Sequence, residues 1–71
     1  MKLTKEFKFF VYLLESYAAH KGTTADKVLK TLDDKNLTQF VYDMYEMYHV
    51  EAIENAFLDI DSLIETGRPA Y

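Results

Sequence analysis

The residues best suited to chemistry lie in one short segment, Glu46-Met47-Tyr48-His49. The spacing Glu-x-x-His puts a carboxylate and an imidazole on one face of a helix, as in the di-metal centres of helical bundles. Those centres need a second Glu-x-x-His pair, and the sequence has none. Because a stable metal site needs about four ligands, we expect none here. We expect Glu46 to lie in solvent and His49 to end a helix.

Two further acids, Asp59 and Asp61, resemble a fragment of a calcium-binding loop. The segment lacks the glycine of the loop turn and the closing glutamate, so we expect solvated acids that flank a buried Ile60. The sequence also has no Ser-His-Asp grouping with supporting glycines and no glycine-rich phosphate loop. We therefore expect no catalysis, no cofactor and no small-molecule substrate.

Aromatic residues are abundant, with six tyrosines and five phenylalanines in 71 residues. Tyr17, Tyr45 and Tyr48 lie on apolar stripes, and we expect them at the edge of the core with their hydroxyls reaching water. Tyr12 and Tyr42 lie off the stripes, and exposed tyrosine supplies large, rigid contact area for a partner. The interface candidates are off-stripe apolar residues and the acids beside them: Phe9, Tyr12, Leu13, Tyr42, Asp43, Glu46 and Met47.

The elements that position these residues are helices. Apolar residues at the i, i+3, i+4, i+7 spacing predict a first helix that Thr4 caps and Gly22 ends. Its apolar face is wide, so we expect this helix to be central and contacted on more than one side. Thr23 is placed to cap a second helix, with Asp26 three residues later. A turn at residues 33–36 ends that helix.

The second half of the chain predicts two more helices. One begins near Asn36 or Leu37 and stops at a kink or short turn around His49-Val50, where the apolar stripe changes phase. The last one ends at Gly67, because Pro69 prevents its continuation.

We therefore predict an all-α fold, a compact bundle of three to four short helices. The chain is expected to be one domain, residues 1–71, with an ordered core over about 4–66 and a C-terminal tail over 67–71. The expected core is the set of apolar residues on the helical stripes: Phe10, Val11, Leu14, Leu29, Leu32, Phe40, Val41, Met44, Phe57 and Ile60.

Composition and charge narrow the function. Hydrophobic residues make up 49% of the chain, whereas so short a chain buries only about 60% of its unfolded surface. Binding to a partner, or self-association, would cover the apolar surface that the core cannot bury. Residues 36–71 carry seven acids and one base, Arg68, which disfavours nucleic acid and favours a basic partner surface. No segment has the ~20 apolar residues of a membrane span, and the absence of cysteine suits the cytoplasm.

Three segments resemble a family of short bacterial proteins known as a domain of unknown function. They are FFVYLLESYAAHKGTTADKVLKTL at residues 9–32, FVYDMYEMYH at 40–49 and FLDIDSLI at 57–64. In the second, Tyr42, Tyr45, Glu46 and His49 correspond to the family pattern, and Tyr48 stands where the family commonly has Leu. In the third, Asp59, Ile60 and Asp61 stand in the corresponding places. Members of that family are often encoded near ADP-ribosyltransferase-like or other toxin-like proteins. The resemblance implies a small neutralising or accessory partner of such a protein.

The function expected from the sequence is thus a non-enzymatic protein-interaction module, which resembles an antitoxin or accessory partner. The alternative is a structural domain that self-associates as a homodimer. A small nucleic-acid-binding regulator is a third hypothesis, which the acidic second half of the chain disfavours.

Overall fold

The structure is a computed structural model that describes residues 3–70; residues 1, 2 and 71 of the expected domain lie outside the described part. It confirms the all-α prediction, and no strand occurs between residues 3 and 70. The helices follow one another in the order α1 (Lys5–Lys21), α2 (Ala25–Asp34), α3 (Thr38–Asp43), α4 (Tyr45–Tyr48) and α5 (Ile53–Thr66).

Both ends of α1 follow the local rules that the sequence indicated. The Phe7 amide donates to the Thr4 side-chain oxygen, 3.0 Å away, which caps the N-terminus. Gly22 takes the left-handed conformation, with φ at 72°. The amides of Gly22 and Thr23 then donate back to carbonyl oxygens of the last turn of α1. The chain can therefore turn directly from α1 into α2.

The N-cap of α2 is Thr24, so the prediction that Thr23 is the cap was wrong by one residue. The Thr23 amide donates to the Ala18 carbonyl, 2.9 Å away, and thereby belongs to the end of α1. The turn predicted at residues 33–36 begins two residues later, because α2 continues through Asp34. There Asn36 adopts a left-handed φ of 60°, a conformation that asparagine tolerates better than most residues.

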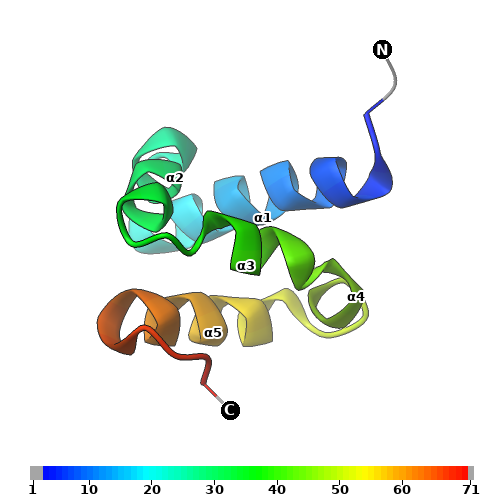
Figure 1. Cartoon of the computed structure of the whole chain (residues 1–71). Helices are drawn as coiled ribbons and strands as arrows, with labels where there is room; N and C mark the ends of the chain where they lie inside the picture. Colours follow the sequence, from blue (N-terminus) through cyan, green and yellow to red (C-terminus); the bar gives the residue numbers. More distant parts are fainter. Residues whose placement is uncertain (1–2, 71) are drawn as a thin grey trace.

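The expected third helix is two helices, because the chain breaks at Met44 as well as after His49. The Met44 amide donates to the Val41 carbonyl in a tight turn, and α4 leaves α3 at a steep angle (Figure 1). This change of direction lets Tyr45 contact α1 while Tyr48 reaches α5. No glycine or proline marks the break. Residues 3–70 form five helices, where the sequence indicated three or four.

The C-terminal end of α5 was predicted correctly at Gly67, which has a φ of 78°. Beyond it the chain folds back along α5. The Ser62 hydroxyl donates to the Arg68 carbonyl, and the Ala70 amide donates to the Asp59 carboxylate, each at 2.8 Å. The segment expected to be a tail is thus attached to α5 as far as Ala70.

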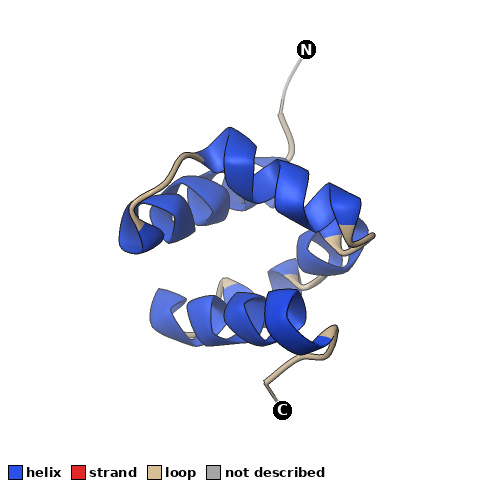
Figure 2. Cartoon of the chain, turned by 90° about the vertical axis from the view of Figure 1, so that its left-hand side faces the viewer, coloured by secondary structure: helices blue, strands red, loops and turns tan. Residues whose placement is uncertain are grey.

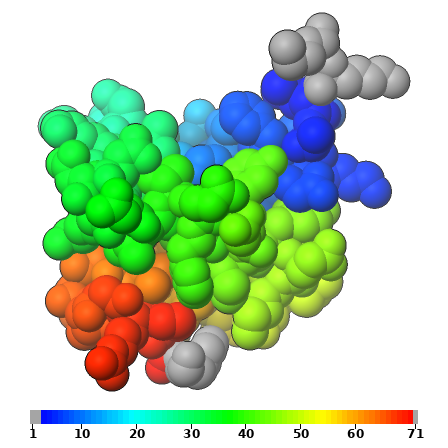
Figure 3. Space-filling model, in the orientation of Figure 1, coloured from blue at the N-terminus to red at the C-terminus, as the bar shows by residue number. Residues whose placement is uncertain are grey.

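The core lies between two groups of helices. Figures 1 and 2 show α1, α2 and α3 on one side and α5 on the other, with α4 connecting them at one end. The space-filling view shows side chains of α5 in contact with those of the opposite group (Figure 3). As expected, α1 is central and contacts α2, α3 and α4. The buried apolar side chains are Phe10, Leu13, Leu14, Tyr17, Ala18, Val28, Leu32, Val41, Tyr48, Ala56, Phe57, Ile60 and Leu63.

Two residues of the expected core are at the surface. Val11 and Phe40 are each 39% exposed, because no neighbouring helix covers the outer edges of the α1 and α3 stripes. Leu29 and Met44 are only partly buried, although they pack against the core.

Candidate functional site

Four aromatic rings gather where α1 faces α4, and we call this group the aromatic patch. It consists of Phe9 and Tyr12 on α1, Tyr45 on α4 and His49 directly after α4. The Phe9 ring centroid lies 6.3 Å from that of Tyr12, 5.6 Å from that of Tyr45 and 6.4 Å from that of His49. The angles between the ring planes, 52–78°, are in the range that aromatic pairs favour.

His49 belongs to this patch through stacking and a backbone hydrogen bond. Its ring lies parallel to that of Tyr45, with centroids 4.2 Å apart. Its Nδ1–H donates to the Tyr45 carbonyl oxygen at 2.6 Å. Within residues 3–70 no three His, Asp or Glu side chains come together as metal ligands. The geometry of His49 is therefore that of a stacked ring that closes the end of α4.

The patch is accessible from solvent. The Tyr12 side chain is 55% exposed, and Phe9 and Tyr45 are partly exposed. Met47 on α4 and Val50 in the following turn add apolar surface, with 48% and 73% exposed. Groups of exposed apolar side chains are typical of binding surfaces.

The acids beside the patch have no cationic partner in the described part of the chain. The ion pairs there are Lys21–Asp61 and Lys30–Asp34. Asp43 is exposed and accepts a hydrogen bond from the Gln39 side chain, at 2.8 Å. Glu46 is exposed on α4 itself. The charge of this surface is thus available to a cationic partner.

One of the interface candidates is buried and another is half-buried. Leu13 is only 1% exposed, because α1 is covered on two sides and this residue lies on the covered part of the helix. Tyr42 is half-buried and packs against the core, with its ring 5.4 Å from that of Phe10. The candidates that are exposed are Tyr12, Asp43, Glu46 and Met47, and Phe9 and Tyr42 are partly exposed.

Tyr48 and Asp59 form a buried pair that the sequence interpretation missed. The Tyr48 hydroxyl donates to the Asp59 carboxylate, 2.8 Å away, and Asp59 is 1% exposed. Its other carboxylate oxygen accepts from the Ala70 amide. The expectation of a solvated Asp59, and of a Tyr48 hydroxyl reaching water, was therefore wrong. A signal existed: Asp59 lies three residues after Ala56 and four before Leu63, on the buried stripe.

Tyr17 and Asp61 form a second such pair, closer to the surface. The Tyr17 hydroxyl donates to Asp61 at 2.5 Å, and the Lys21 ammonium lies 3.0 Å from the same oxygen. Burial, reinforced by the hydrogen bond to Asp61, raises the pKa of Tyr17 above its ordinary value. Burial acts to raise the pKa of Asp61, but the hydrogen bonds from Tyr17 and Lys21 together lower it. These groups join α1 to α5 and leave the tyrosine hydroxyl turned inward.

The comparison with protein families identifies the chain. A family described as a protein of unknown function (DUF3791) matches residues 8–67, and the chain belongs to this family. The comparison with curated proteins and the comparison with solved structures each gave no match. Within the described residues, no helix is both long and apolar enough to span a bilayer.

Proposed function

We propose that the domain is a non-enzymatic protein-interaction module whose contact surface is the aromatic patch. The observation that supports this most is the partly exposed group of aromatic rings in mutual contact, next to acids that have no cation within residues 3–70. Rigid aromatic side chains are the residues that contribute most to protein–protein affinity.

The acids beside the patch favour one kind of partner. Asp43 and Glu46 favour a protein whose apolar contact surface is bordered by lysine or arginine. The same acids repel phosphate groups, which argues against a nucleic-acid-binding regulator. The resemblance described above implies a toxin-like neighbour, and on this ground we propose an antitoxin-like or accessory role in the bacterial cytoplasm. In this role the module would bind the protein encoded next to it.

The test is to measure binding to that neighbouring protein by calorimetry. Tyr12→Ser and Met47→Ser should each weaken binding by about tenfold or more if they lie at the centre of the interface. Leu58→Ser is the matched control, because Leu58 is 59% exposed but lies on α5. Equal effects of Tyr12→Ser and Leu58→Ser would refute the patch as the contact surface.

One observation favours self-association as a second candidate. Lys5 and Lys8 lie seven and four residues before Tyr12, on the same side of α1, and both are exposed. The patch therefore has lysines on its α1 side and acids such as Glu46 on its α4 side. Two copies related by a two-fold axis could place each lysine near an acid of the other copy.

The variant Lys8→Glu distinguishes the two candidates. It should strengthen binding to a basic partner, because it adds an acid beside the patch. It should weaken a homodimer, because it removes the attraction between the two copies. Light scattering across a range of protein concentrations measures the homodimer, and calorimetry measures the heterocomplex. Lys30→Glu is the matched control, since Lys30 pairs with Asp34 on α2.

A further inference from the structure

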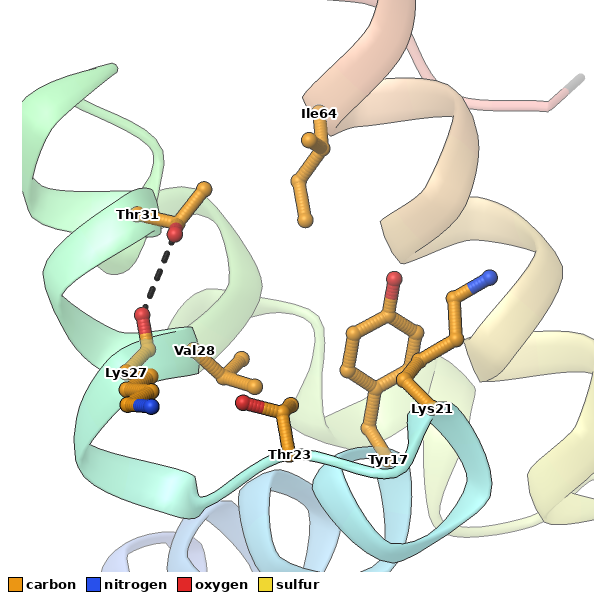
Figure 4. Close-up of a pocket in the computed structure, with 7 residues that line it drawn as sticks. All are labelled: Tyr17, Lys21, Thr23, Lys27, Val28, Thr31 and Ile64. Carbon is orange, nitrogen blue, oxygen red and sulfur yellow. Dashed lines mark hydrogen bonds between the residues drawn. The ribbon is translucent and has the colours of Figure 1, made fainter.

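A pocket of about 240 Å³ lies between the C-terminal end of α1, α2 and α5. Figure 4 shows the side chains of these helices arranged around it, with the turn after α1 at its lower edge. The first pocket residue on α1 is Tyr17, five residues after Tyr12. The pocket is therefore separate from the aromatic patch, and no sequence motif marks it.

The size of the pocket limits its occupant. Sites for cofactors and drug-sized ligands measure about 300–1,000 Å³. A volume of about 240 Å³ is below this range. It suits one compact group, such as an aromatic ring with a short chain.

The walls of the pocket are mainly apolar. Val28 on α2 is buried, Ile64 on α5 is half-buried, and the Tyr17 ring on α1 lines the pocket with them (Figure 4). An apolar group in contact with these three side chains would be removed from water on several sides, which favours binding.

Most polar groups around the pocket already have partners. The Tyr17 hydroxyl and the Lys21 ammonium both bond to Asp61. The Thr31 hydroxyl donates to the Lys27 carbonyl at 3.0 Å (Figure 4). These groups therefore add no unmet hydrogen-bonding requirement inside the pocket.

Two polar side chains at the pocket make no such bond within residues 3–70. The Thr23 hydroxyl and the Lys27 ammonium make no hydrogen bond or ion pair with any side chain or backbone atom of residues 3–70. They come from the turn after α1 and from the first turns of α2, so they border the same side of the pocket (Figure 4). Asp26, next to Lys27, accepts a hydrogen bond from Thr24 that lowers the pKa of Asp26, and the nearby charge of Lys27 lowers it further without a close ion pair. One hydroxyl and one cation are thus available to an anionic acceptor.

We propose that this pocket binds a compact apolar group joined to a carboxylate. The apolar group contacts Val28, Ile64 and the Tyr17 ring, and the carboxylate accepts hydrogen bonds from Lys27 and Thr23. This site departs from the expectation that the chain has no small-molecule ligand. It does not depend on the function proposed for the aromatic patch.

The experiment is a titration of the full chain with a ligand, in which ¹H–¹⁵N correlation spectra are recorded at each ligand concentration. The probe is 3-phenylpropionate, and its neutral amide, 3-phenylpropionamide, is the matched control. The acid should cause saturable shifts of the Thr23, Lys27, Val28 and Ile64 amides at up to about 10 mM, the affinity range of such small ligands. The amide should bind at least roughly twofold more weakly, since it lacks the charge that Lys27 attracts.

Two variants test the assignment. Lys27→Gln should weaken binding of the acid roughly two- to fivefold, as for a single exposed ion pair, and should not change binding of the amide. Lys30→Gln, on the same helix but paired with Asp34, should change neither. Both lysines are exposed, so the fold should persist, and the spectrum of each free variant checks this.

Three results would overturn the proposal. They are the absence of saturable shifts at the pocket, equal binding of acid and amide, and equal effects of Lys27→Gln and Lys30→Gln. The source of the carboxylate is tested with N-acetylphenylalanine, which resembles the C-terminus of a polypeptide. Tighter binding of this probe supports a peptide C-terminus as the ligand, and tighter binding of 3-phenylpropionate supports a free acid.

Discussion

The second and the fifth helix are attached to α1 by different interactions. Between α1 and α2 the packing is aliphatic, with Leu14, Val28 and Leu32 in the core and no side-chain hydrogen bond between the two helices in the described residues. Between α1 and α5 it is aromatic and polar. Phe57 lies against rings of α1, and the Tyr17 hydroxyl donates to Asp61.

This difference shows what tyrosine and aspartate can do in a small core. An aliphatic contact depends on area and shape, and neighbouring side chains can partly replace it. A buried carboxylate costs free energy unless hydrogen bonds compensate for its lost water. Asp59 therefore requires the Tyr48 hydroxyl and the Ala70 amide at defined positions. The Tyr48–Asp59 hydrogen bond joins α5 to α4, and the Tyr17–Asp61 hydrogen bond joins α5 to α1.

The largest expected effect is that of Phe57→Ala. The ring centroid of Phe57 lies 5.7 Å from that of Tyr17 and 5.0 Å from that of His20. Its loss would leave a cavity between α1 and α5, and we expect the free energy of unfolding to fall by about 3–5 kcal/mol. Urea unfolding followed by circular dichroism measures it. Leu58→Ala, at the adjacent exposed position, should cost less than about 0.5 kcal/mol. Similar values for the two variants would mean that α5 is not attached through Phe57.

Asp59→Ala should have the second-largest effect on the free energy of unfolding. It removes the acceptor of the Tyr48 hydroxyl and of the Ala70 amide, and we expect a loss of about 1–3 kcal/mol. Asp59→Asn should cost less, because the amide oxygen still accepts one hydrogen bond. The matched control is Asp43→Ala, at an exposed position, which should change stability by less than about 0.5 kcal/mol. If the two alanine variants unfold at the same urea concentration, the buried pair does not stabilise α5.

The comparison also explains how far the sequence predicts this fold. Thr4, Gly22 and Gly67 act through their own backbone neighbours, so their roles were predicted correctly. The break at Met44 depends on contacts of Tyr45 and Tyr48 with α1 and α5, and methionine itself is a good helix former. No local pattern could therefore indicate it.

Contacts between distant segments also limit how much of the candidate site the sequence can predict. Tyr12 and Met47 are exposed because they lie off their apolar stripes, as the periodicity predicted. Leu13 is also off the main stripe, but α1 is covered on two sides and the residue is buried. Tyr17 and Asp61 are 44 residues apart in the chain, so their hydrogen bond could not be predicted from spacing.

Tyr17→Phe should have an intermediate effect, because it removes the hydrogen bond to Asp61 and keeps the ring. We expect a loss of about 0.5–1.5 kcal/mol near pH 7. The pKa of Asp61 in the folded chain is below its ordinary 3.8, so its contribution is present above that pH and is lost as the pH falls through the lowered value. The stability difference between parent and variant should therefore narrow in acid.

The stability of the same variant at alkaline pH gives an independent measurement. The pKa of Tyr17 is raised in the folded chain, so its contribution is fully present below its ordinary value of 10.0 and is lost as the pH rises through the raised value. The parent should lose stability above about pH 10 more steeply than Tyr17→Phe. Parallel curves for the two proteins at both extremes of pH would show that the hydroxyl does not couple to Asp61.

The smallest expected effects on stability are those of the two ion pairs, which should differ from each other. Lys21 and Asp61 join α1 to α5 with 43% and 30% of their side chains exposed, whereas Lys30 and Asp34 lie on one helix and are 76% and 63% exposed. Lys21→Gln should cost about 0.2–1 kcal/mol, and Lys30→Gln less than about 0.5 kcal/mol, because exposed pairs are hydrated and screened. Unfolding at low and high salt measures both, and the cost of Lys21→Gln should shrink as salt rises. Equal costs at low salt would mean that the pair between helices behaves as an ordinary surface pair. In that case α5 is attached through Phe57 and the two tyrosine–aspartate hydrogen bonds, without a measurable contribution from Lys21.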